Sequence, residues 1–198
     1  MEARLDLLMF PVTLSYPNKG RKYMKNKSAK SLLIGSAIVG ALALGSASAS
    51  ETPWHNYISG GYYDFGDSGF FIDGAAQVNE QFVLNAEIGD TNFTSVRIGG
   101  RFLTGVDLGT APLFLSLGYA DYSRGFDGVY FGAGITHPLD TNIHSIFELN
   151  HDTAGDGFWR FRSGLMYHLN ENLSVQGSYS LNTDSVRNEF KLGVAYRF

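Results

Sequence analysis

Glu189-Phe190-Lys191-Leu192-Gly193-Val194-Ala195-Tyr196-Arg197-Phe198 is the stretch that decides the fold of this chain, because apolar residues alternate strictly with small or charged ones. A β-strand points successive side chains to opposite faces, so this segment has one apolar face and one polar face. The pattern is typical of a strand that closes a barrel in a membrane, with lipid outside and a polar lumen inside. The apolar positions are Phe190, Leu192, Val194, Tyr196 and Phe198.

The N-terminal quarter of the chain has the composition of a secretory signal peptide. A basic segment is followed by an apolar run from Leu32 to Gly45 and then by the small residues Ala47-Ser48-Ala49. We predict cleavage after Ala49, so that residues 1–49 are an N-terminal extension plus signal peptide and residues 50–198 are the mature domain. The apolar run is too short for a comfortable membrane anchor. Met24 is a possible true start.

The composition of the mature region excludes several classes of protein. Removing residues 1–49 takes away seven of the 15 basic residues and two of the 19 acidic ones, which leaves a net charge of −9. Such a balance argues against nucleic acid as a partner, because nucleic-acid binding calls for a basic patch. Cysteine is absent, which excludes disulfides, thiolate metal sites and cysteine nucleophiles.

Ten segments of the mature region alternate in the same way. We therefore predict an all-β fold, a closed antiparallel transmembrane β-barrel, most readily of ten strands; merging two weak segments gives eight as the alternative. An even number places both termini on one side of the membrane. The connection 103–112, with two glycines and a proline, is expected to be a longer turn. The ten segments are 56–64, 70–78, 82–90, 93–102, 113–121, 129–137, 143–150, 158–169, 173–182 and 186–198.

Charged residues of both signs fall on the predicted inward face. A narrow barrel is largely filled by its own side chains, and a charge without a partner is costly away from water. We therefore expect a polar plug of paired charges, with an ion or proton path as the alternative. The inward residues are Asp73, Glu87, Arg97, Arg101, Glu148, Arg160, Arg162, Glu189, Lys191 and Arg197.

The predicted outer loops are rich in aspartate. Their spacing matches no calcium-binding loop, so we interpret them as solvated turn residues rather than as a divalent-cation site. No catalytic residue, metal site or cofactor site is predicted from the sequence. The loop aspartates are Asp64, Asp67, Asp90, Asp121, Asp127, Asp152, Asp156 and Asp184, opposed by Arg124 and Arg187.

The whole mature region resembles the small bacterial outer-membrane β-barrel family that includes the OmpA transmembrane domain and the OmpX/Ail group. The signal peptide, the alternation, the terminal Phe198 and aromatic residues gathered near strand ends carry this resemblance. We expect those aromatic residues, among them Tyr63, Phe65, Phe71, Phe93 and Tyr122, to form two belts on the outer wall at the boundaries between lipid and water. It implies a location in the bacterial outer membrane, with outer-membrane lipid and lipopolysaccharide as partners. It also implies that the assembly machinery for barrels recognises the last strand. Ligand and oligomeric state stay open.

Two function classes follow, and a third is weaker. The first is a structural or surface role with a plugged lumen. The second is a narrow pore that prefers cations because the loop aspartates form an acidic rim at its mouth. The third is an enzyme. The pair His151-Asp152 occupies the position of a His–Asp pair in omptin proteases, but no second aspartate pair matches. The sequence from His151 to Gly155 departs from the His-x-Ser-Asn motif of the lipid A deacylases at the nucleophile.

Overall fold

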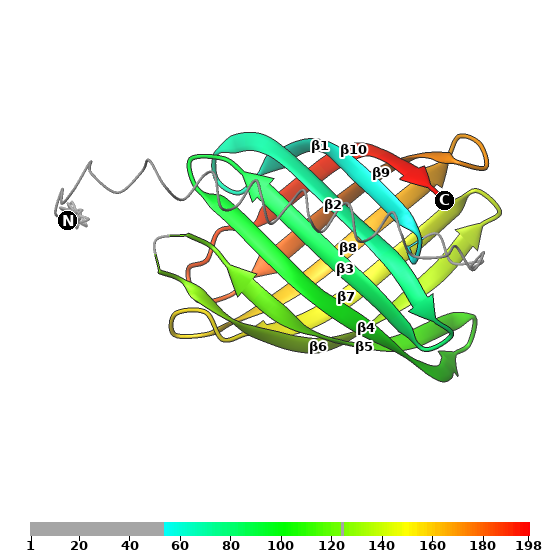
Figure 1. The fold of residues 1–198 in the computed structure, drawn as a ribbon, viewed down its shortest axis with the longest axis horizontal. Coiled ribbons are helices and arrows are strands. Elements are labelled where there is room, and N and C mark those ends of the chain that lie inside the picture. The colour runs from blue at the N-terminus through cyan, green and yellow to red at the C-terminus, as the bar shows by residue number, and fades with distance from the viewer. Residues whose placement is uncertain (1–53, 124) are drawn as a thin grey trace, which may run out of the picture.

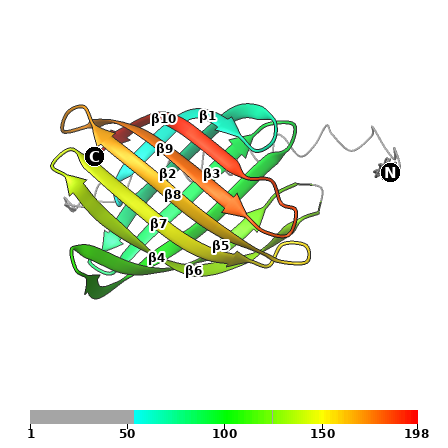
Figure 2. The same cartoon turned by 180° about the vertical axis from the view of Figure 1, so that it is seen from behind.

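The computed structural model describes residues 54–123 and 125–198, which form one closed antiparallel barrel (Figure 1, Figure 2). The predicted signal peptide and Met24 lie outside the described residues. Each strand pairs with its neighbours in sequence, and β1 pairs with β10, so the expectation of ten strands is confirmed and eight is excluded. The strands are β1 (Tyr57–Asp64), β2 (Ser68–Asn79), β3 (Phe82–Asp90), β4 (Thr94–Leu108), β5 (Ala111–Asp121), β6 (Asp127–Asp140), β7 (Ile143–Asp152), β8 (Phe158–His168), β9 (Leu173–Asn182) and β10 (Glu189–Arg197).

The barrel has two different ends. The terminal end carries the start of β1, the end of β10 and four short turns, and it lies on the right in Figure 1. The loop end carries the five connections that follow the odd-numbered strands. The described part of the chain contains no helix with the length and hydropathy needed for a membrane crossing.

The last strand closes the sheet. β1 and β10 pair without a break from Tyr57↔Arg197 to Asp64↔Phe190, so the described sheet has no free edge. The alternate residues Phe190, Leu192, Val194 and Tyr196 are all exposed on the outer wall. Phe198 follows the strand, and its N–H donates to the carbonyl of Asn56 at 3.4 Å.

The two faces of the wall follow the alternation. On β8, Trp159, Phe161 and Leu165 are exposed, whereas Arg160 and Arg162 between them are buried in the lumen. An apolar outside and a charged inside are the reverse of a soluble barrel, and they suit a wall that contacts lipid.

The expected long turn at 103–112 is wrong. β4 continues to Leu108, and after a register shift between Leu103 and Asp107 the pairing resumes at Asp107↔Pro112 and ends at Leu108↔Ala111. Gly105 lies within this shift with a φ of 71°, a conformation that glycine adopts without a Cβ clash. This register shift is a β-bulge, and the β4–β5 hairpin continues beyond it to the turn after Leu108.

Candidate functional site: the lumen

The structure places the predicted inward charges inside the barrel. Asp73, Glu87, Arg97, Arg101, Glu148, Arg160, Arg162, Glu189 and Lys191 are each less than one-tenth exposed. Arg197 is less buried and lies at the terminal end. The inward face is therefore charged along much of the length of the lumen, and the arrangement of these charges decides what the lumen can do.

Five ion pairs connect the buried charges. They involve five carboxylates and five cations, so the set as a whole is neutral. None joins two strands that are neighbours in the sheet, so each pair reaches across lumen space. The pairs are Arg97–Asp152 (Nη1–Oδ2, 3.3 Å), Arg101–Glu148 (Nη2–Oε2, 3.7 Å), Arg160–Glu189 (Nη2–Oε2, 2.5 Å), Arg162–Asp73 (Nη2–Oδ2, 4.0 Å) and Lys191–Glu87 (Nζ–Oε1, 2.5 Å).

Two carboxylates lie side by side on the wall and need cations from elsewhere. Asp73 on β2 and Glu87 on β3 are direct partners in the register. Like charges at this position destabilise each other, and here the cations come from Arg162 on β8 and Lys191 on β10. Gln176 adds a hydrogen bond from Nε2 to Oδ1 of Asp73 at 3.1 Å. The two acids are thus balanced by groups from other sides of the barrel.

Asp152 belongs to the lumen, so its expected place among the outer-loop aspartates is wrong. β7 extends two residues beyond its predicted end at Asn150, and period two then turns Asp152 inward, where it is fully buried. The Tyr122 hydroxyl donates to its Oδ2 at 2.6 Å, and Arg97 donates to the same oxygen. Burial raises the pKa of Tyr122, which keeps this hydroxyl protonated as a donor.

His151 and Asp152 do not form a catalytic pair. They are adjacent on one strand and face opposite sides of the wall. The His151 ring lies between Phe131 and Trp159, with centroid distances of 5.5 Å and 5.0 Å. Within residues 54–123 and 125–198, no three His, Cys, Asp or Glu side chains are grouped to hold a metal ion.

An apolar plug at the terminal end was missed from the sequence. Trp54 precedes β1 and is completely buried against a cluster that includes Phe114, Ile146 and Met166. Arg101 Nη1 donates to the Trp54 carbonyl at 3.4 Å. Because Arg101 also pairs with Glu148, this hydrogen bond links the apolar plug to the charged layer, which consists of the five buried ion pairs in the middle of the lumen. The inward positions of Phe114, Ile146 and Met166 were available from the alternation, whereas a single tryptophan before the first strand has no periodic partner.

His55 follows Trp54 into this end of the barrel and is also buried. Burial lowers its pKa to about 4, and the nearby charge of Arg101 acts in the same direction. The ring is therefore neutral at neutral pH, which suits its position beside an arginine.

Aromatic side chains cover the lumen at the loop end. Tyr63, Phe65 and Phe71 are buried there, with Phe93 and Tyr122 packed against them. These residues were expected in the aromatic belts of the outer wall, and that expectation is wrong for them because they turn inward or across the mouth. Phe65 lies in the short connection after β1 and is buried against Tyr63 and Phe71 rather than exposed on the outer wall.

Glycines in the wall make room for an inward ring. The Tyr130 hydroxyl would lie 2.3 Å from a Cβ on Gly99 and 2.5 Å from one on Gly118, so larger residues do not fit there. The Arg97 guanidinium lies 4.2 Å from the centre of the Tyr130 ring. Small residues in the strand middles thus serve the packing of the lumen.

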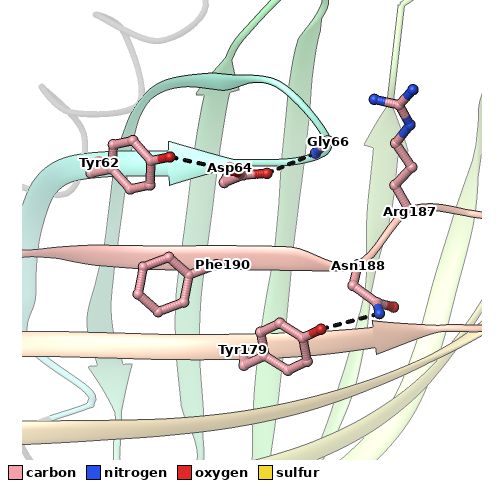
Figure 3. A pocket seen from close by; sticks show the side chains of 7 residues that line it. All are labelled: Tyr62, Asp64, Gly66, Tyr179, Arg187, Asn188 and Phe190. Carbon is pink, nitrogen blue, oxygen red and sulfur yellow. Dashed lines mark hydrogen bonds between the residues drawn. The ribbon is translucent and has the colours of Figure 1, made fainter.

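The outer wall near the loop end carries exposed aromatic rings (Figure 3). Tyr62, Tyr179 and Phe190 lie over β1, β9 and β10 beside a shallow hollow of about 590 Å³. The Tyr62 hydroxyl donates to Asp64 at 3.2 Å, and Asn188 Nδ2 donates to the Tyr179 hydroxyl at 3.1 Å. Rings with an apolar body and a polar tip are typical of the boundary between lipid and water.

Comparisons with known proteins gave a family match and several structural neighbours of low sequence identity. Among solved structures, the NanC porin is 9% identical with a TM-score of 0.49 and covers 72% of this chain and 100% of that one. The KdgM porin is 10% identical with a TM-score of 0.47, and the alignment covers 72% of this chain and 99% of the porin. Ail of Yersinia pestis is 14% identical with a TM-score of 0.38, and the alignment covers 73% of this chain and 99% of Ail. A search of curated proteins found no match. The family described as outer membrane protein beta-barrel domain matches residues 34–198. The chain belongs to this family and is a β-barrel protein of the bacterial outer membrane.

Proposed function

We propose that this barrel is a structural or surface component of the outer membrane and that its lumen does not conduct ions or solutes. The observation that carries the proposal is the set of five buried ion pairs, each of which joins strands that are not neighbours. A conducting channel needs a continuous polar path lined by groups that bind an ion weakly. In this lumen the carboxylates and cations bind each other.

The two ends support the same proposal. A permeating ion has to pass Trp54 and its apolar neighbours at the terminal end and the aromatic cover around Phe65 at the loop end. Apolar constrictions oppose ions because they provide no replacement for the water of hydration. Closure thus involves three successive layers, of which the middle one is charged and the outer two are apolar.

We further propose that the protein is not an enzyme. The one His–Asp pair that suggested hydrolysis is split between the two faces of β7. The exposed residues of β10 suit recognition by the assembly machinery, and the rings of Figure 3 suit contact with lipid and lipopolysaccharide.

Potassium efflux from liposomes tests the proposal. The chain is purified from outer membranes and reconstituted, and its folded state is established by heat-modifiable gel mobility. We expect efflux at the level of protein-free liposomes, with an open porin at the same protein-to-lipid ratio as the positive control. Efflux that rises with the amount of folded protein supports the narrow pore instead, and a preference for potassium over chloride assigns it to the acidic rim.

A further inference from the structure

The hollow on the outer wall lies at the loop end, where β1 and β9 end and β10 begins (Figure 3). In outer-membrane barrels the short turns lie at the periplasmic end and the longer loops at the outer end, which places this hollow in the outer leaflet. The molecules beside it in the membrane are therefore lipids of that leaflet. Its lining combines Tyr62, Tyr179 and Phe190 with the polar residues Asp64, Gly66, Arg187 and Asn188.

The rings of the hollow mark the level at which headgroups meet acyl chains. Tyr62, Tyr179 and Phe190 are between 41% and 46% exposed. The Tyr62 hydroxyl lies 3.0 Å from Oγ of Ser68, and Asn188 Nδ2 donates to the Tyr179 hydroxyl at 3.1 Å. Ser68 and Asn188 lie next to the loop-end connections, so the polar tips are on the water side of the rings. This orientation is typical of residues at the boundary between lipid and water.

On the lipid side of the rings, the wall has space for an apolar chain. Gly177 shares the outward face of β9 with Tyr179, two positions away. A Cβ on Gly177 would meet only the Lys191 carbonyl oxygen at 3.5 Å and Leu192 Cδ1 at 3.8 Å. No side chain therefore projects at this position, and the exposed Leu192 borders it. An acyl chain that passes Tyr179 can lie against this part of the wall.

Arg187 supplies a positive charge on the water side of the rings. Its side chain is 63% exposed and occupies the space that a Cβ on Gly66 would take. Its guanidinium makes no hydrogen bond to another residue of the described chain. Asp67 lies 3.7 Å away (Nη1–Oδ2), but water screens such an exposed pair. The planar fork of donors is therefore available to a phosphate, which it can bind in a bidentate manner.

The acids beside Arg187 have different parts. Asp64 Oδ1 accepts the Gly66 N–H at 2.9 Å, and its Oδ2 accepts the Tyr62 hydroxyl at 3.2 Å. Each carboxylate oxygen has a further lone pair, so Asp64 can also accept a hydroxyl from a sugar. Asp67 instead competes with a phosphate for Arg187. The water side of the hollow thus offers one donor fork and one acceptor for hydroxyl groups.

We propose that this hollow binds an outer-leaflet glycolipid that carries a phosphate monoester on a sugar, which is the chemistry of the lipid A part of lipopolysaccharide. The phosphate binds Arg187, a sugar hydroxyl donates to Asp64, and an acyl chain passes Tyr179 towards Gly177. A monoester carries about −1.5 to −2 charges at pH 7, whereas the diester of most phospholipids carries a single charge. The site rests on the surface role proposed above but not on closure of the lumen, so lipid binding and potassium efflux test the two separately.

Native mass spectrometry of the full chain, purified from outer membranes and exchanged into a neutral detergent, tests the proposal. Occupancy of the one-to-one complex is compared for lipid A, dephosphorylated lipid A and phosphatidic acid, with inorganic phosphate as a competitor. We expect lipid A to bind about fivefold more tightly than its dephosphorylated form, because a basic residue at a lipid surface contributes about that factor. Phosphatidic acid is expected to bind more weakly than lipid A, and inorganic phosphate is expected not to displace it.

Two charge variants assign the phosphate to Arg187. Arg187→Met keeps an apolar stem and removes the charge, so the preference for phosphorylated lipid A is expected to disappear. Asp67→Asn removes the competing acid, so the preference is expected to increase. Opposite effects from two neighbouring substitutions are not expected of a general change in the surface.

Two tyrosine variants assign the lipid to this part of the wall. Tyr179→Ala is expected to weaken binding of both forms of lipid A. The matched control is Tyr119→Ala on β5, which removes a ring that is also 46% exposed and is expected to change nothing.

Several results would overturn the proposal. They are equal binding of the two forms of lipid A, a preference that survives Arg187→Met, and equal effects of the two tyrosine variants. Phosphatidic acid that binds as tightly as lipid A would replace the glycolipid with a phospholipid. Displacement of lipid A by inorganic phosphate would replace the lipid with a free anion.

Discussion

The middle of the lumen and its terminal end both contain buried side chains, but different interactions hold these side chains together. The middle is spanned by ion pairs such as Lys191–Glu87 and Arg160–Glu189, whose members are buried. The terminal end is filled by Trp54, with Phe114 and Met166 in the same cluster. The charged layer depends on each partner being present, whereas the apolar plug depends on volume and shape.

The two regions are therefore sensitive to different kinds of substitution. Removing one member of a buried ion pair leaves the other charge without compensation, which costs more than the pair itself contributes. Removing an apolar residue leaves a cavity, whose cost scales with its size. The expected effects can therefore be ordered.

The largest effect is expected from Lys191→Met. Glu87 then keeps its buried charge beside Asp73 without a partner, so the free energy of unfolding is expected to fall by about 3–5 kcal/mol. The urea midpoint of the heat-modifiable gel shift measures the loss. Adding Glu87→Gln to the variant is expected to restore much of the stability, and a single variant as stable as the double variant contradicts a closely coupled pair.

Trp54→Ala is expected to cost about 3 kcal/mol, because it empties a fully buried site at the terminal end. The same urea series measures it, with Trp159→Ala as the matched control on the exposed outer wall. Potassium efflux is expected to stay at the blank level, since the five ion pairs remain. An unchanged urea midpoint is the result that rules out a packed plug.

Acid is expected to weaken the terminal end through His55. Its folded pKa of about 4 is below the unfolded value of about 6.5, so the unfolded chain binds the proton more readily. This contribution to stability is complete above pH 6.5 and is lost as the pH falls from there towards 4. Comparing urea midpoints across that range with those of His55→Gln isolates it, and parallel curves for both proteins argue against a buried neutral ring.

The smallest effect is expected from Arg187→Met at the loop end. Arg187 lies 3.7 Å from Asp67, but its side chain is 63% exposed. Water screens such a pair, so the change in stability is expected to stay below about 1 kcal/mol. Lys191→Met is measured in the same urea series, so the two variants compare a buried ion pair with an exposed one. Equal losses in the free energy of unfolding for both variants would show that burial does not matter.

The fold was predictable from period two, and the lumen was predictable only in part. Alternation places Arg160 and Arg162 inward whatever their partners are, because strand geometry is local. Which carboxylate each cation meets depends on closure of the barrel, and Asp152 was misplaced because two further residues of β7 decide its face. Trp54 lies outside any strand, so no periodic signal indicated that it enters the lumen.

Single-channel recording in a planar bilayer is the decisive measurement for closure of the barrel by the cross-lumen ion pairs and the apolar plug. We expect the unaltered chain, inserted in its folded form, to give no stable current steps at potentials where an open porin gives ohmic steps. Reproducible ohmic steps from the unaltered chain, abolished when it is unfolded, would rule out closure and make the protein a small pore.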